Sequence, residues 1–409
     1  MNILVLNAGS STQKSAVFNL DVTSDEVTAP IWEGRIEWNE SWASITTHNK
    51  RSKPKEERIP FEQGANNERC EITQRMLEGI WNGPRAVVSS CEDIDLIGHR
   101  IVHGGPHLRK SAVITSQIKR LIQEAALFAP LHNQVELEGI NLSEKIFPGA
   151  PQIAVFDTSF HRTMPQFATL YPGPYDWLEK GIIRYGFHGI NHQYCAKRAA
   201  QMLQQNLISL KIVSCHLGNG CSLAAIDKGI SVDTTMGFTP LDGLMMGTRS
   251  GAIDPGIVLY LTQHDEQTSK EIDQVLNHES GLLGISGCSS DMREVIHQAQ
   301  AGHARSKLAF DMFIHVLSKE IAAMAASLSG MDVLVFTAGI GENSPDVRQA
   351  ACDQLAFLGI RIDAEKNVAL KSDGELSATN SGVRILIIAA QEDWAIAEEC
   401  LKLNAAKFQ

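Results

Sequence analysis

The sequence predicts an α/β protein of two domains, each built on a mixed β-sheet. Its 409 residues are enough for two or three domains of about 100–200 residues. Short apolar runs alternate with segments of helical spacing, which is typical of α/β folds. An apolar run, a small-residue turn and a second apolar run occur twice, over residues 2–20 and 210–227. This repetition indicates a duplicated α/β core with a cleft between its two copies.

In the first half, residues 2–7 and 15–20 read as a strand pair around a glycine turn. Residues 35–70 are polar, and we expect an irregular surface excursion there. The elements expected after it are a strand near Ile94–Gly98, a helix over Ser116–Phe128 and a buried strand at Gln152–Phe156.

In the second half, the amphipathic segment Asn191–Asn206 predicts a helix. The remaining expected elements are strands at Leu210–His216, Ser222–Asp227, Val333–Phe336 and Ile385–Ile388, a long helix over Ser306–Leu328 and a final helix from about Trp394. The predicted domains are residues 1–156, completed by the C-terminal helix 394–409, and residues 157–393, which we expect to bind nucleotide.

Composition excludes several classes of partner. The net charge of −11 is spread along the chain, which disfavours nucleic acid and anionic membranes as main partners. Eight dispersed cysteines form no CxxC pair, so a zinc site or disulfide framework is not expected. No 18-residue apolar run and no secretory leader occurs, and the thiols suit a reducing compartment, so we expect a soluble cytoplasmic protein.

Three glycine-containing segments follow apolar strands, at Asn7–Thr12, Leu217–Gly220 and Gly339–Asn343. Glycine lets backbone amides approach phosphate oxygens, and it adopts the conformations of an anion-binding turn. A single such turn is weak evidence, because glycine turns between strands are common. The chain has no GxxxxGK[ST] sequence, and no GxGxxG opens a predicted helix, which excludes a Walker-type site and disfavours a dinucleotide fold.

Two arginines are candidates for binding anions. Arg100 lies between His99 and a glycine pair, and Arg249 lies in the sequence Gly-Thr-Arg-Ser-Gly. The guanidinium group suits carboxylate and phosphate oxygens, although a lone arginine more often makes a structural ion pair. The small neighbouring residues leave room for a ligand and favour the functional interpretation.

Four further side chains have both a functional and a structural interpretation. Asp157 ends a predicted strand, where it would hold a metal, orient a nucleophile or cap a helix. Glu392 opens the last helix, where a carboxylate also stabilises the helix dipole. His188 in Tyr-Gly-Phe-His-Gly and His132 in Pro-Leu-His-Asn are candidate site residues or satisfied core histidines.

These motifs together resemble the acetokinase family over essentially the whole chain. The run Met236–Gly251, Met-Gly-Phe-Thr-Pro-Leu-Asp-Gly-Leu-Met-Met-Gly-Thr-Arg-Ser-Gly, is the most specific of them. The other matching segments are Asn7–Ser11 with Lys14, His99–Gly105, Tyr185–Gly189, His216–Gly220 and Phe336–Ser344.

The resemblance implies two duplicated actin-like (ribonuclease H-like) α/β domains, the fold that acetate and sugar kinases share with Hsp70 and actin. It implies reversible transfer of a phosphoryl group from ATP to acetate, giving ADP and acetyl phosphate, with Mg²⁺ (or Mn²⁺ in its place), in a homodimer.

The resemblance also assigns roles to individual residues. It implies Arg100, Asp157, His188 and Arg249 as catalytic residues, Arg100 with Val102, Leu131, His132 and Pro240 as the acetate site, and Asn7 with Glu392 as the metal site. The nucleotide contacts that it implies are Ser10, Thr12, Lys14, His216, Leu217, Gly218, Asn219, Gly220, Asp291, Met292, Arg293, Gly339, Ile340, Gly341, Glu342 and Asn343.

The chemistry agrees with these roles. A carboxylate nucleophile is already ionised at neutral pH, so the main obstacle is its repulsion by the γ-phosphoryl oxygens, which cationic groups relieve. We expect Asp157 to hold metal-bound water rather than to act as a base. Some positions depart from the family's pattern, among them Thr12, Ala252, Asn191 and Ala390–Gln391.

Two alternatives stay open at this point. Pocket size decides between acetate and propionate, and one methylene is worth only about 1–3 kcal/mol in such pockets. A binding module gated by ATP, of the Hsp70 or actin type, would have the same fold but no use for two arginines, a histidine and a methyl-sized apolar pocket.

Overall fold

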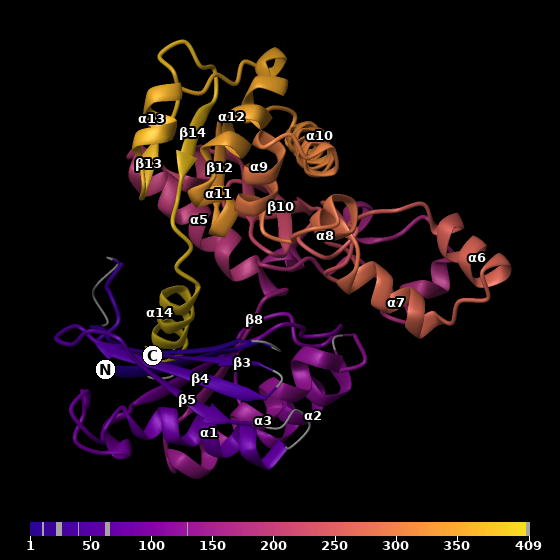
Figure 1. Cartoon of the computed structure of the whole chain (residues 1–409). Coiled ribbons are helices and arrows are strands. Elements are labelled where there is room, and N and C mark those ends of the chain that lie inside the picture. Colours follow the sequence, from indigo (N-terminus) through magenta and orange to yellow (C-terminus); the bar gives the residue numbers. More distant parts are fainter. Residues whose placement is uncertain (10–11, 22–26, 40, 62–65, 129, 406–409) are drawn as a thin grey trace. The chain divides into compact units, whose positions relative to one another are not determined.

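The computed structural model describes residues 1–9, 12–21, 27–39, 41–61, 66–128 and 130–405, and of residues 66–67 and 130–132 only the backbone. The chain forms two compact units, each with its own sheet (Figure 1). The first unit comprises Met1–Ser159 and Gln391–Gln409, and the second comprises Phe160–Ala390. The roles expected for the two domains stay predictions.

The first unit contains an eight-stranded mixed sheet with the order β5-β4-β3-β2-β1-β6-β8-β7. Its central strand β1 pairs antiparallel with β2 and parallel with β6, and β6 pairs parallel with β8. The strands are β1 (Asn2–Ala8), β2 (Thr12–Asn19), β3 (Trp32–Trp38), β4 (Trp42–Asn49), β5 (Lys55–Pro60), β6 (Leu96–Ile101), β7 (Ala112–Val113) and β8 (Gln152–Phe156).

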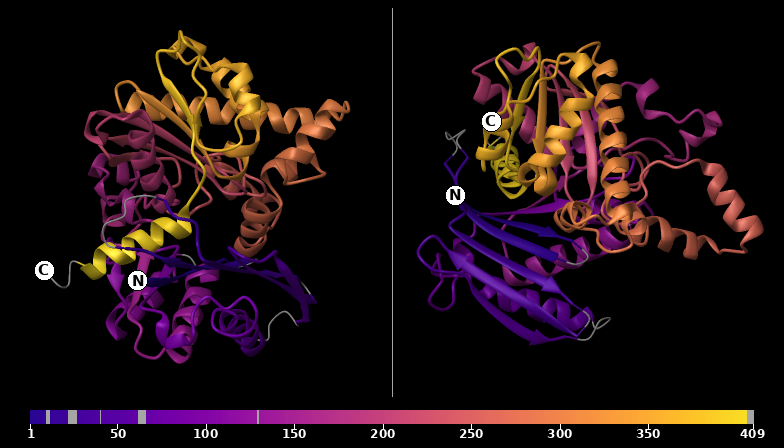
Figure 2. Two further views of the ribbon diagram at one scale, coloured as in Figure 1. Left: turned by 90° about the vertical axis from the view of Figure 1, so that its left-hand side faces the viewer. Right: turned by 45° about the horizontal axis from the view of Figure 1, so that its top comes forward.

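Helices cover both faces of this sheet. Helices α1 and α3 lie on one face, and α14 packs against β1 and β6 on the other (Figures 1 and 2). The helices of this unit are α1 (Asn66–Glu78), α2 (Ser116–Ala125), α3 (Pro130–Ile146) and α14 (Glu392–Ala405), with a short 3₁₀ turn at Cys91–Asp93. The last helix of the chain therefore completes the first unit's core, because its buried residues pack on the first strand.

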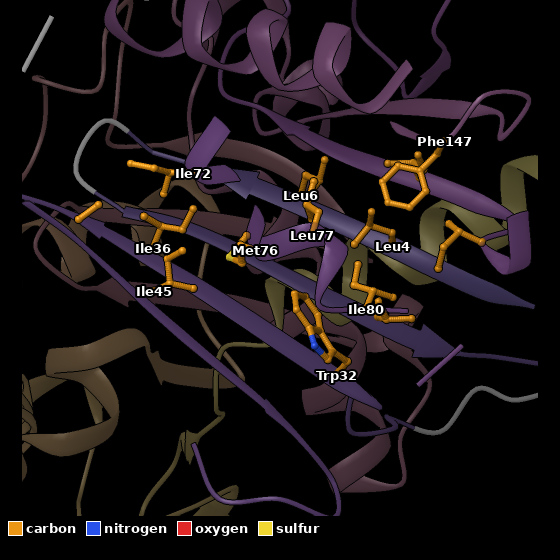
Figure 3. Close-up of a cluster of buried hydrophobic side chains, with 14 of the residues drawn as sticks. Leu4, Leu6, Trp32, Ile36, Ile45, Ile72, Met76, Leu77, Ile80 and Phe147 are labelled. Atoms are coloured by element: carbon orange, nitrogen blue, oxygen red, sulfur yellow. The ribbon is translucent and has the colours of Figure 1, made fainter. Parts of the chain in front are cut away.

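The prediction for residues 35–70 is wrong. This part of the chain forms most of β3, all of β4 and β5, and the start of α1. Strand β3 alternates between buried residues and charged residues that are exposed or half-buried, and β5, which has no buried residue, carries four of the charged residues that made the segment read as polar. Trp32, Ile36 and Ile45 from these strands pack with Met76 and Leu77 of α1 in one hydrophobic core (Figure 3). A charged edge strand such as β5 also discourages pairing with other chains.

The second unit repeats the topology of the first. Its six-stranded sheet has the order β11-β10-β9-β12-β14-β13. The strands are β9 (Lys211–Leu217), β10 (Cys221–Asp227), β11 (Ile230–Thr234), β12 (Val333–Thr337), β13 (Gly374–Glu375) and β14 (Arg384–Ile387). Strand β9 is antiparallel to β10 and parallel to β12, as β1 is to β2 and β6, so β11-β10-β9-β12-β14 corresponds to β3-β2-β1-β6-β8. The expected duplication is confirmed.

The second unit's helices include several that the sequence did not lead us to expect. They are α4 (Gln166–Thr169), α5 (Gly189–Leu203), α6 (Pro255–His264), α7 (Ser269–His278), α8 (Gly281–Ser286), α9 (Met292–Gln300), α10 (Ala304–Ser327), α11 (Ala338–Asn343), α12 (Pro345–Gln354) and α13 (Ala364–Ala369). The 3₁₀ turns are Ser159–Thr163, Tyr175–Trp177, Leu207–Ser209 and Ala356–Leu358. Of the helices in the described residues, none is long and apolar enough to cross a bilayer.

Two local predictions need correction. The segment Gly339–Asn343, read as a loop, forms most of the short helix α11. Arg100 lies within β6, whereas the sequence placed it after a strand that ended at Gly98. In both cases a glycine suggested that the strand had ended. Gly98 instead lies within β6, where Cys400 and Ile396 of α14 pack so closely on the strand that a side chain would not fit.

Candidate active site

Arg100 and Asp157 form a buried ion pair in the first unit. Arg100 lies on β6, and Asp157 follows the neighbouring parallel strand β8, so the two side chains emerge at the same edge of the sheet. Arg100 Nη2 donates to Asp157 Oδ2 at 2.9 Å, and the Asp157 side chain is only 1% exposed. Burial lowers the pKa of Arg100, but the carboxylates of Asp157, Glu392 and Glu136 outweigh burial and raise it above its ordinary value. The guanidinium is therefore charged at every physiological pH.

Two adjacent carboxylates at the start of α14 lie close to this ion pair. Burial raises the pKa of Glu392, and Asp157 raises it further, whereas Arg100, Lys14 and Asn7 lower it. Burial also raises the pKa of Asp393, whose Oδ1 accepts a hydrogen bond from Asn7 Nδ2 at 3.1 Å. Buried carboxylates with raised pKa values favour the binding of a cation, because a cation stabilises their ionised forms.

The oxygen atoms of Asn7, Asp157 and Glu392 suit a hard divalent cation. Carboxylate and amide oxygens are the protein ligands that Mg²⁺ prefers. Among the described residues, no group of three or more His, Cys, Asp and Glu side chains forms a metal cage. Mg²⁺ is usually held by one or two carboxylates and otherwise by water and substrate phosphates. When bound, it would neutralise charge on the phosphate oxygens.

The predicted acetate pocket is only partly described. Val102 follows β6 and is 4% exposed, and its backbone N–H donates to both carboxylate oxygens of Glu136 at 3.1 Å. Leu131 and His132 lie in the first turn of α3, but their side chains lie outside the described part of the chain. Pro240 lies in the second unit, where its carbonyl accepts a hydrogen bond from Arg249 Nη1 at 3.3 Å.

The first glycine turn connects β1 and β2. Gly9 N–H donates to the carbonyl of Thr12 at 2.8 Å, which closes the turn, and Ser10 lies outside the described residues. Lys14 pairs in register with Asn7 and is exposed. The Lys14 ammonium is near enough to the α14 carboxylates to lower the pKa of both.

Three segments far apart in the sequence line one pocket of the second unit, with a volume of about 430 Å³. That volume lies within the range of small-molecule sites. Eight of the predicted nucleotide contacts line it, together with Ser290 and Ser344: Gly218, Asn219, Asp291, Met292, Arg293, Gly339, Ile340 and Asn343. Asp291 caps α9 by accepting from Arg293 N, and the exposed Arg293 side chain pairs with it at 2.5 Å.

The other predicted nucleotide contacts of this unit do not line the pocket. Leu217 is fully buried at the end of β9. Gly341 lies inside α11, close to the backbone of Phe336, where a Cβ would be tightly packed. Glu342 Oε1 accepts from Ala390 N at 2.9 Å, so this side chain holds the chain that follows β14.

His188 is held in an uncommon backbone conformation at the start of α5. Its φ of 55° and ψ of 24° are left-handed, which is unusual for a residue other than glycine and recurs at functional sites. The His188 ring stacks on His216, with centroids 3.9 Å apart and planes 10° apart. His216 Nδ1 in turn lies 2.9 Å from Asn191 Nδ2, so the unusual Asn191 supports this stack.

Arg249 lies next to His188 across Gly220. A Cβ at Gly220 would lie 3.5 Å from Arg249 Nη1 and 3.6 Å from His188 Nε2. Burial lowers the pKa of Arg249, and within the described part of the chain no carboxylate pairs with it; its side chain donates instead to the carbonyl of Pro240. A partly buried cation without an anion is costly, so this site favours an anionic ligand.

Sequence reasoning missed two acidic residues of the first unit. Asp393 shares the start of α14 with Glu392, and an acidic pair opening a helix was a visible signal. Glu136 lies on α3, whose helical pattern was overlooked. It is 2% exposed, and burial raises its pKa to about 8. No local sequence signal brings Glu136 to Arg100, because only the packing of α3 on β6 does so.

Comparison with known proteins agrees with this geometry. The sequence model of the acetokinase family matches residues 2–398. The acetate kinase of Nostoc sp. is 49% identical over 407 residues, covering 98% of this chain and 99% of that protein. The acetate kinase of Cyanothece sp. is 48% identical over 412 residues and covers all of both.

Solved structures agree as well. The acetate kinase of Porphyromonas gingivalis has a TM-score of 0.90 at 33% identity, and a propionate kinase from Francisella tularensis has a TM-score of 0.86 at 38% identity. Each comparison covers 98% of this chain and 99% of the other. The likeness confirms the predicted class of two actin-like α/β domains. With the family model matched almost from end to end, this chain belongs to the acetokinase family.

Proposed function

We propose that this enzyme transfers the γ-phosphoryl group of ATP directly and reversibly to the carboxylate of acetate, giving acetyl phosphate and ADP. The observation that carries the proposal is Arg249, a partly buried cation without a carboxylate partner among the described residues, beside His188 and Gly220, which directly follows the pocket-lining residues Gly218 and Asn219. An arginine in this position suits the dispersed negative charge of a phosphoryl group in flight.

The proposed roles follow from the two kinds of arginine environment. Arg100, held by Asp157, binds the carboxylate of acetate, and Val102 bounds the space for its methyl group. Arg249 and His188 stabilise the transferring phosphoryl group. The adenosine and diphosphate of the nucleotide occupy the pocket of the second unit, where Asn219 and Gly339 lie at its wall. Lys14 and Thr12 contact the phosphates from the first glycine turn.

The finer assignments belong to the same proposal. Asn7 and Glu392 hold Mg²⁺, which Mn²⁺ can replace, and Asp157 holds water bound to the metal. A hard divalent ion suits these oxygen donors. The enzyme acts as a cytoplasmic homodimer, as the family resemblance implies.

The test is ADP release by the purified enzyme with Mg-ATP and a panel of short carboxylic acids. We expect release to depend on acetate, with formate and butyrate poorer acceptors. Propionate as the best acceptor would make the enzyme a propionate kinase, a function favoured by the 38% identical propionate kinase of Francisella tularensis. ATP hydrolysis without any acceptor would instead favour an ATP-gated binding module.

A further inference from the structure

A chain of hydrogen-bonded side chains leads from His188 into the interior of the second unit. His188 Nδ1 lies 2.8 Å from Ser222 Oγ, and the same oxygen lies 2.8 Å from His192 Nε2. His192 Nδ1 lies 2.9 Å from Ser214 Oγ. Strands β10 and β9 supply the two serines and helix α5 supplies His192, and all three side chains are fully buried.

We propose that Ser214, His192 and Ser222 fix the tautomer of His188, so that the neutral ring carries its proton on Nε2 and presents it as a hydrogen-bond donor. Ser222 is thus a positioning residue for His188. The inference deepens the proposed phosphoryl transfer and rests on it only for the kinetic part of its test.

Ser214, at the buried end of this series of hydrogen bonds, determines which atom donates and which accepts in each bond. Within the described residues, His192 Nδ1 is the one hydrogen-bond partner of Ser214 Oγ, so this buried hydroxyl can place its proton only there. The Nδ1 atom of His192 is then an acceptor, and its Nε2 must carry the proton and donate to Ser222 Oγ.

The donor and the acceptor in the bond between Ser222 and His188 are then determined as well. Ser222 Oγ accepts from His192, so its own proton goes to His188 Nδ1. A neutral His188 ring with an accepting Nδ1 carries its proton on Nε2. The opposite direction would leave the Ser214 hydroxyl proton buried without an acceptor, which costs about 1–3 kcal/mol. That cost selects one direction by about 5- to 150-fold.

His188 Nε2, at the outer end of these hydrogen bonds, faces the place where an anionic oxygen would need a hydrogen-bond donor. His188 Nε2 and Arg249 Nη1 both lie about one van der Waals contact from the position that a Cβ at Gly220 would fill. The absence of a side chain at Gly220 keeps this space open. A donor at Nε2 would serve an anionic oxygen held by Arg249, whereas a lone pair at Nε2 would repel that oxygen.

The buried His192 is neutral throughout the physiological pH range. Burial lowers the pKa of His192 well below its ordinary value, and the neighbouring rings of His161 and His216 lower it further. Among the described residues, the other titratable or charged groups seen beside His188 are His216, stacked on its ring, Arg249 across Gly220, and Cys221, whose pKa burial raises to about 12. None of these groups supplies an anion that would reverse the order of donors and acceptors in these hydrogen bonds.

The direct test is nuclear magnetic resonance of the wild-type enzyme with ¹⁵N-labelled histidine, with His188→Gln used to assign the signals. We expect the His188 nitrogen shifts of the Nε2–H tautomer at pH 7.5. A dominant Nδ1–H tautomer overturns the inference, and this measurement needs no activity and no substitution of Ser214, His192 or Ser222.

Substitutions of Ser222 and Ser214 test whether these hydrogen bonds set the tautomer of His188. Ser222→Ala and Ser214→Ala should each mix the His188 tautomers and lower kcat, with about a tenfold loss for Ser222→Ala. The matched control is Ser231→Ala, because Ser231 Oγ makes a comparable buried bond of 2.8 Å to His161 Nδ1 outside the chain. It should leave both the tautomer and kcat unchanged.

The outcomes separate the two proposals. Pure Nε2–H tautomer in folded Ser222→Ala, or equal losses of kcat in Ser222→Ala and Ser231→Ala, would overturn the role of the chain. Wild-type enzyme with the Nε2–H tautomer but no acetate-dependent ADP release would refute the proposed function and leave this inference standing.

Discussion

Replacing Arg249 by alanine should remove catalysis without weakening the fold. The guanidinium makes one bond of 3.3 Å to the carbonyl of Pro240, and in the described structure it has no carboxylate partner that its loss would leave buried and unpaired. Arg100→Ala is different, because it would leave the 1% exposed carboxylate of Asp157 without its cation, a loss of about 3–5 kcal/mol of stability.

The expected loss of turnover in Arg249→Ala is on the order of 10³-fold, the lower end of what an arginine contributes to phosphoryl transfer. It corresponds to about 4 kcal/mol of transition-state stabilisation. Arg249 is not among the residues that line the pocket proposed for the nucleotide, so the KM for ATP should change by less than about threefold. The midpoint of thermal unfolding should fall by no more than a few degrees.

The assay is coupled ADP release with acetate varied at saturating ATP and with ATP varied at saturating acetate. Arg361→Ala is the matched control, since the exposed Arg361 also donates a single side-chain bond, of 3.0 Å, to a carbonyl, that of Ala356. It should leave kcat and KM unchanged. A rise in the KM for ATP as large as the fall in kcat would refute a role confined to the transition state.

Three further predictions concern the first unit. Val102→Ala should shift the preference from acetate towards propionate by about tenfold in relative kcat/KM, and an unchanged preference in the acid panel would remove Val102 from the pocket. Asp157→Asn should raise the Mg²⁺ concentration needed for half-maximal activity; lost turnover at an unchanged Mg²⁺ requirement would contradict the proposed water-holding role. Burial raises the pKa of Glu136 to about 8, so between about pH 4.5 and 8 the folded chain keeps a proton that the unfolded chain releases, and stability falls as pH rises through that range. Glu136→Gln should flatten this dependence by a few kcal/mol in urea unfolding measured from pH 5 to 8, and an unaltered slope would show that other groups cause it.

Apolar strands were predictable from the sequence because burial on both faces makes them continuous hydrophobic runs. Strand β8 occupies the predicted range Gln152–Phe156, and all five of its residues are buried. The strand pair β9 and β10 is likewise close to its predicted limits. Strand β3 was missed because one of its faces is solvated, so charged residues occupy every second position and hide the pattern, and β5 was missed because it opens with four charged residues and buries none of its side chains.

Several helices were missed although their start signals are present. Asp254 caps α6 directly before Pro255, and Thr268 with Glu271 forms a capping box at the start of α7. No residue of α6 is buried, so its apolar side chains follow no buried stripe from which a helix could be recognised. The residues of the candidate site were easier to predict than the residues that hold them in place. Arg100 and Asp157 lie in recognisable sequence motifs, whereas Glu136 and Asp393 contribute only through packing and hydrogen bonds.

In the proposed mechanism, the two arginines let an acidic chain bind two anions. Arg100 is paired with the buried Asp157 at 2.9 Å without any ligand, so its guanidinium is already oriented and part of its charge is already compensated. That environment suits a small carboxylate, which must be positioned rather than strongly held. Arg249 has no such partner among the described residues, and its charge is therefore available when negative charge spreads over the phosphoryl oxygens. An acidic side chain three residues after Arg249, as in Ala252→Asp, should consequently reduce kcat more than it reduces ATP binding if it pairs with the guanidinium, because it would compensate in advance the charge that the transition state requires.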